Sequence, residues 1–104
     1  MPEPTPIPPI PDPPKDVGLR RPDELDAWHA VWPRAVLLRP DFDAERDAVP
    51  LALLTSEWAA YVRYRRWRDP AGREVAAEAL DRCSRLAHAL KLAETEVELE
   101  ALFV

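Results

Sequence analysis

The 104-residue chain is poor in the residues that build many chemical sites. It has one cysteine, Cys83, and two glycines, which excludes an internal disulfide and a Gly-rich phosphate loop. A lone cysteine is typical of a reducing compartment, so we expect a cytoplasmic protein. No apolar run reaches the ~18 residues that a membrane-spanning helix needs, and no signal-peptide pattern opens the sequence. We therefore expect no membrane association.

Patterns for catalysis or metal binding are equally scarce. The two histidines and the cysteine fall on different predicted helices without ligand spacing. Ser56 and Ser84 lie inside helices without a nucleophile-elbow signature. His29 stands beside two tryptophans, which favours a half-buried packing role, and Cys83 lies on an apolar helix stripe. We expect no enzyme, no metal site and no cofactor.

Proline is abundant, with 13 residues, and it is concentrated at the N-terminus. Proline cannot donate a backbone hydrogen bond to a ladder or a helix interior. Residues 1–14 therefore predict an extended segment, and residues 1–21 a disordered Pro-rich tail and linker. Two interpretations stay open, a simple spacer or a ligand for an aromatic-lined groove.

Residues 22–93 show helical periodicity and no defensible strand pattern, which predicts an all-α domain. A short first helix opens at Pro22, Pro33 is expected to end or kink it, and residues 36–38 are expected to form a short apolar connection to the next helix. A second helix begins after Asp41 or Asp43 and runs to about Arg68. A turn capped by Asp69 then leads into a third helix with one wide apolar stripe. Together the second and third helices predict a long antiparallel hairpin.

The second helix has two apolar faces, where one would be enough to dock a surface helix on a core. Because the third helix can cover only one of them, we expect the other face to be a homo-oligomer interface. This predicted interface consists of Val49, Leu53, Ala60, Tyr64 and Trp67.

Arginines crowd the end of the predicted hairpin and alternate with aromatic residues. Arginine binds phosphate in a bidentate manner, and aromatic rings offer stacking surfaces. This pattern predicts DNA binding by a local positive patch on a chain whose net charge is −5. The alternative interpretation is a rim of solvated arginines without a ligand. The predicted DNA-binding residues are Arg63, Arg65, Arg66, Arg68 and Arg73.

The last eleven residues, 94–104, break the stripe of the third helix. Thr95 and Glu98 have the spacing of a capping box, which predicts a short, acidic, amphipathic C-terminal helix. A helix this short is marginal alone, so we expect it to order against a partner. The predicted partner-binding residues are Val97, Leu99, Leu102 and Phe103.

The order of these signals resembles the small terminase subunit of tailed phages, in the HK97-like group. Members carry a proline, a leucine three residues later and a helix with tryptophan, matched here by Pro22, Leu25, Trp28 and Trp32. A long helix rich in Ala, Tyr and Arg follows, and then a leucine-rich phrase. Lys91–Glu96 is acidic where the family is often basic, and the chain lacks room for a separate helix-turn-helix domain. A stripped-down version of the kind found in gene transfer agents fits this length.

The resemblance implies a noncatalytic DNA-packaging adaptor in a bacterial host cell. Such a protein would form a ring, bind double-stranded DNA weakly and without sequence preference, and recruit the large terminase ATPase-nuclease subunit. The C-terminal helix would dock either on its neighbour in the ring or in a groove of that motor. The other hypothesis is a small helical protein-interaction or regulatory module without a nucleic-acid role.

Overall fold

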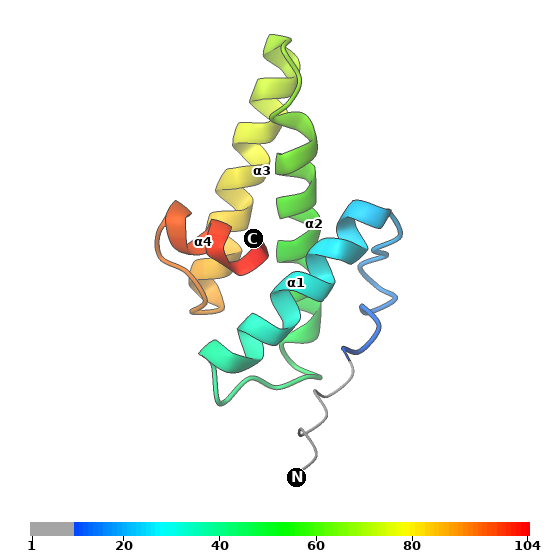
Figure 1. Cartoon of the computed structure of the whole chain (residues 1–104), viewed down its shortest axis with the longest axis vertical. Helices are drawn as coiled ribbons and strands as arrows, with labels where there is room; N and C mark the ends of the chain where they lie inside the picture. Colours follow the sequence, from blue (N-terminus) through cyan, green and yellow to red (C-terminus); the bar gives the residue numbers. More distant parts are fainter. Residues whose placement is uncertain (1–9) are drawn as a thin grey trace, which may run out of the picture.

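The computed structural model describes residues 10–104, and within that range the chain is all-helical. Its helices are α1 (Pro22–Leu38), α2 (Ala48–Tyr64), α3 (Pro70–Ala89) and α4 (Glu96–Phe103). The long helices α2 and α3 lie side by side, α1 crosses the lower half of α2, and α4 packs on α1 and α3 (Figure 1). The end where α2 leads into α3 projects beyond α1 and α4. The all-α prediction is confirmed for the described residues.

Local capping chemistry sets the starts of α3 and α4. The Asp69 carboxylate accepts a hydrogen bond from the Gly72 amide at 2.6 Å, and Pro70 occupies the first helical turn. The Thr95 hydroxyl accepts a hydrogen bond from the Glu98 amide at 3.2 Å. Both starts agree with the prediction because each depends on residues three positions apart.

Pro33 does not end α1, which continues to Leu38. Trp32 and Ala35, on either side of the proline, are buried on the core face. Packing on both sides therefore holds the helix through the proline despite its missing amide donor. The predicted connection of residues 36–38 is instead the last helical turn, and its apolar side chains are exposed.

The second helix begins later and ends earlier than predicted, at Ala48 and Tyr64. Asp43 caps the preceding turn, where its carboxylate accepts hydrogen bonds from the amides of Glu45 and Arg46. These two backbone donors hold the pKa of Asp43 below its ordinary value. A hydrogen bond from Arg46, and then one from the Asp43 amide, lower the pKa of Asp47 in the same way.

Residues 10–21 belong to the folded body and not to a tail. Leu19 is buried, while Ile10 and Val17 pack against the core. The indole N–H of Trp28 donates to the Pro11 carbonyl at 2.8 Å. This corrects the predicted linker from residue 10 onward. The prediction for residues 1–9 lies outside the described residues.

The core is formed where α1, α2, α3 and α4 meet. Trp28, Leu51 and Leu54 are fully buried there, as is Cys83, whose thiol contacts the Leu54 carbonyl at 3.6 Å. Burial, and then the charge of Glu57, raise the pKa of Cys83 to about 12. Cys83 is therefore a neutral thiol at physiological pH and acts as a small core residue.

The C-terminal helix α4 is part of this same core. Leu99 and Leu102 are buried, and the Phe103 ring stacks on Trp58 with centroids 4.9 Å apart. Arg34 of α1 donates a hydrogen bond to the Ala101 carbonyl at 2.8 Å. Residues 94–104 thus pack on their own chain, because the apolar face of α4 completes the surface left by α1 and α3.

Candidate nucleic-acid interface and adjoining surfaces

The five predicted DNA-binding arginines lie at the projecting end, which we call the tip (residues 63–73). Arg63 is in the last turn of α2, Arg65, Arg66 and Arg68 follow in the connection, and Arg73 is in the first turn of α3. Positive charge is favourable at a helix C-terminus but unfavourable at a helix N-terminus. The dipole of α2 can account for the first arginines of the tip, but that of α3 does not account for Arg73.

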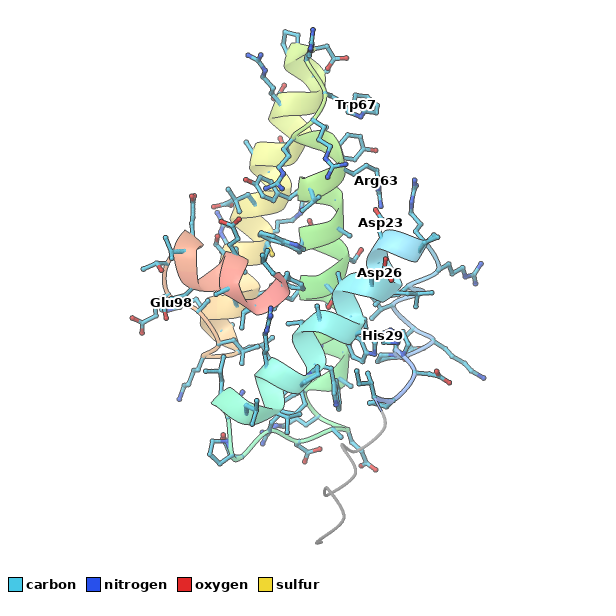
Figure 2. All side chains as sticks on the ribbon, in the orientation of Figure 1. Asp23, Asp26, His29, Arg63, Trp67 and Glu98 are labelled. Carbon is cyan, nitrogen blue, oxygen red and sulfur yellow. The ribbon has the colours of Figure 1, made fainter. Side chains whose placement is uncertain are left out.

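Arg63 is engaged within the chain. Its guanidinium pairs with the Asp23 carboxylate of α1 at 2.9 Å, and Figure 2 shows the two side chains pointing toward each other. Its side chain is 24% exposed. Arg63 is therefore a brace between α1 and α2 and the least available of the five arginines.

The other arginines of the tip are more open. The Arg65 guanidinium lies over the Tyr61 ring, 5.3 Å from its centroid, as in a cation–π contact. Arg66, Arg68 and Arg73 are exposed, and none forms an ion pair with any residue from 10 to 104. These three side chains are the part of the tip best placed to bind an external anion.

Trp67 belongs to the tip and not to α2, which ends three residues earlier. Trp67 is 50% exposed, and its ring meets the Tyr64 ring edge-on, with centroids 4.9 Å apart. The backbone of Gly72 passes so close that an added Cβ there would lie 2.5 Å from the Trp67 Cβ. Sequence periodicity placed Trp67 on the interface face because it assumed a helix that continued to Arg68.

The remaining predicted interface residues form an apolar line along α2, which we call the α2 stripe (Val49, Leu53, Ala60 and Tyr64). Val49 and Leu53 are 38% and 44% exposed, and the other two are half-buried. The opposite face of α2 carries the fully buried Leu51 and Leu54. The face of α2 with Leu51 and Leu54 is thus covered by the rest of the chain, whereas no described residue fully covers the α2 stripe.

The predicted partner-binding residues are mostly unavailable. Leu99 and Leu102 are buried and Phe103 stacks on Trp58, while Val97 is 79% exposed. Leu99, Leu102 and Phe103 contact their own chain, so Val97 is the member of this set that is open to a partner.

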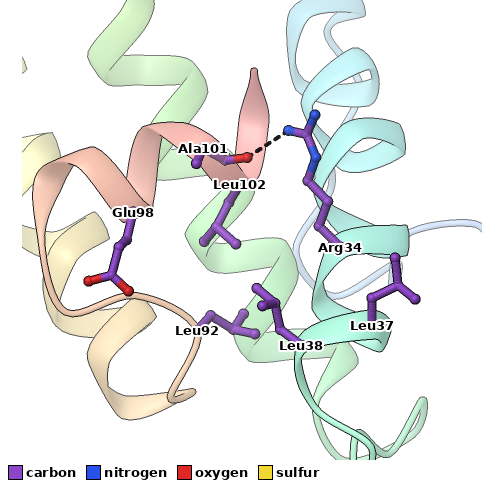
Figure 3. Close-up of a pocket in the computed structure, with 7 residues that line it drawn as sticks. All are labelled: Arg34, Leu37, Leu38, Leu92, Glu98, Ala101 and Leu102. Atoms are coloured by element: carbon purple, nitrogen blue, oxygen red, sulfur yellow. Dashed lines mark hydrogen bonds between the residues drawn. The ribbon is translucent and has the colours of Figure 1, made fainter.

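A different apolar surface lies between the end of α1 and α4. This groove has a volume of about 340 Å³, and Leu37, at its edge, is 82% exposed. Figure 3 shows Arg34 reaching across it to Ala101. Sequence reasoning missed it because residues 36–38 were interpreted as a connection. The groove is lined by Arg34, Leu37, Leu38, Leu92, Glu98, Ala101 and Leu102.

Other candidate chemistry is sparse in the described part of the chain. His29 is exposed, which corrects its predicted half-buried packing role. Between residues 10 and 104, no three His, Cys, Asp or Glu side chains gather in a way that could hold a metal ion. Within the same range, no helix is long and apolar enough to cross a membrane.

Comparisons with protein-family models, curated proteins and solved structures yield no match to this chain. The tip, the α2 stripe and the groove are the features of the molecule that bear on its function.

Proposed function

We propose that the chain is a noncatalytic DNA-packaging adaptor, similar to the small terminase subunits that its sequence resembles. It forms a homo-oligomer through the α2 stripe and binds double-stranded DNA through the tip. It then presents that DNA to a large ATPase-nuclease subunit. The observation that carries the proposal is the tip, where exposed arginines surround an exposed tryptophan on the projecting end of the α2–α3 hairpin.

The charge of the tip supports contact with phosphate. Residues 63–73 contain five arginines and one acid, Asp69, in a chain whose net charge is −5. The local sign therefore opposes the overall sign, as expected for a confined anion-binding surface on an acidic protein. Contacts of this kind bind the DNA backbone and carry no sequence information, so binding should be weak and nonspecific.

The α2 stripe supports assembly. It extends from Val49 to Tyr64, about 22 Å along the helix at 1.5 Å per residue, and it overlaps the tip at Tyr64. An interface along this line would bring several tips near one another. Weak contacts would then combine through avidity.

Leu53→Glu should dissociate the oligomer, because it places a charge in the centre of an apolar interface, where desolvation costs several kcal/mol. The matched control is Leu37→Glu, since Leu37 is also an exposed leucine but lies outside the stripe. Light scattering should give one chain mass for the first variant and an oligomer mass for the control. A single-chain mass for the unmodified protein at micromolar concentration would contradict the assembly.

The triple variant Arg66→Glu, Arg68→Glu and Arg73→Glu should bind duplex DNA much more weakly than the original chain. Each phosphate contact releases counterions, so three lost contacts per chain should flatten the slope of log K against log salt by about 2.7. Fluorescence anisotropy with a labelled duplex across a salt series measures both the affinity and this slope.

The control for the tip variant carries the same change of net charge elsewhere. Lys15, Arg20 and Arg85 are exposed and lie outside the tip, so their combined replacement by Glu should leave most of the affinity. If the two triple variants bind DNA as well as the original chain does, the tip is a solvated rim.

A second candidate function is a small helical protein-interaction module without a nucleic-acid role. The groove between α1 and α4 favours it, because exposed apolar surface beside a hollow is typical of protein contacts. Loss of DNA binding in the tip variant alone would favour the packaging adaptor. Absence of DNA binding in the unmodified chain would favour this second function.

A further inference from the structure

Trp67 differs from the other tryptophans in its exposure to solvent. All four tryptophans lie in the described part of the chain, and Trp28, Trp32 and Trp58 are at most 9% exposed. Trp67 is 50% exposed, whereas every other Trp, Tyr and Phe residue between residues 10 and 104 is buried or half-buried. A half-exposed indole at a projecting end has no packing role that accounts for its open surface.

The position of this ring is set by its surroundings. The Tyr64 ring meets the Trp67 ring edge-on, with centroids 4.9 Å apart. The Trp67 amide donates a hydrogen bond to the Tyr64 carbonyl at 3.1 Å. Gly72 leaves room for the Trp67 ring. A Cβ at residue 72 would lie 3.1 Å from the indole Cε3 and would also collide with the Trp67 Cβ. The Asp69 carboxylate holds the Gly72 amide and so closes the turn. A ring held in this way loses little conformational freedom on binding.

The neighbours of Trp67 are cationic. Arg66 and Arg68 flank it in the chain, and Arg73 follows Gly72; all three lack an ion-pair partner among residues 10–104. An open aromatic ring among guanidinium groups combines the two elements that bind single-stranded nucleic acid, a stacking surface and phosphate contacts. Bases inside a duplex already stack on each other, so a protein ring reaches a base only where the strand is unpaired.

We propose that Trp67 stacks on an unpaired base and that the tip therefore prefers single-stranded or frayed DNA to an equally charged backbone without bases. This inference rests on the proposed DNA-binding function of the tip and adds the form of DNA that the tip selects. The arginines supply binding to any phosphate backbone, and Trp67 supplies the preference for exposed bases.

The test compares a thymidine oligonucleotide with an abasic oligonucleotide of equal length and phosphate count. Stacking of one base contributes about 1–3 kcal/mol, so the thymidine strand should bind about 5- to 150-fold more tightly. Trp67→Ala should remove this ratio while leaving the salt dependence, and Trp67→Tyr should keep much of it. Because the other three tryptophans are buried, quenching of tryptophan fluorescence by the thymidine strand reports on Trp67 directly.

The outcomes separate this inference from the function on which it rests. Equal affinity for the thymidine and abasic strands, with binding still lost in the arginine variant, overturns the stacking role and leaves the DNA-binding tip in place. The stacking role is also overturned if Trp67→Ala retains the original ratio with an unchanged thermal melt. Absence of binding to every DNA overturns both proposals.

Discussion

A chain that ends after Ala93 should lose its cooperative fold. The truncation removes Leu99 and Leu102, which are 1% and 2% exposed, and the Phe103 ring that stacks on Trp58. Replacing one buried leucine by alanine costs about 2–5 kcal/mol, while a small domain has a total stability of about 5–15 kcal/mol. Losing three core side chains is therefore comparable to the whole stability, and circular dichroism during urea unfolding should show little native helix.

Helix α4 offers a matched pair of single changes for the same prediction. Leu99→Ala should lower the free energy of unfolding by about 2–5 kcal/mol, because Leu99 is buried. Val97→Ala should change it by about 0.5 kcal/mol or less, because Val97 is 79% exposed. An unchanged urea midpoint for the truncated chain would show that α4 contributes nothing to the core.

Trp28→Ala should lower the free energy of unfolding by about 3–5 kcal/mol. Trp28 is fully buried, and its ring lies 5.1 Å from that of Trp32. The change also removes the hydrogen bond to the Pro11 carbonyl, which releases the segment before α1. Thermal and urea unfolding followed by circular dichroism measure the loss.

The control for this variant is Trp67→Ala, which removes the same side-chain volume from an exposed position. Its effect on stability should stay below about 1 kcal/mol, since surface changes are usually small. If both variants lower the urea midpoint equally, then burial of Trp28 does not stabilise the core as predicted.

Features that depend on residues a few positions apart could be predicted from the sequence. The caps at Asp69 and Thr95 need only a side chain and an amide three residues later. The passage of α1 through Pro33 and the end of α2 at Tyr64 could not, because tertiary packing decides how far each helix extends. Periodicity shows that a helix has an apolar face but not which element covers it.

The same limit applies to the candidate site. The arginines and aromatic rings of the tip are close in sequence, so their clustering was predictable. The pairing of Arg63 with Asp23 joins residues 40 positions apart, and nothing in the local sequence indicates it. The burial of Leu99 also depends on a distant contact, because the surface that receives α4 is built partly by α1.

The separation of charge along the molecule bears on how it would meet a nucleic acid. Positive charge is concentrated at the tip, while acidic residues such as Glu98 lie lower on the body (Figure 2). In dilute buffer the net negative charge would slow every approach to DNA except one in which the tip leads. At physiological ionic strength the Debye length is about 8 Å, so a phosphate near the tip senses mainly the tip. The encounter rate and the orientation of the complex would thus depend on salt in different ways.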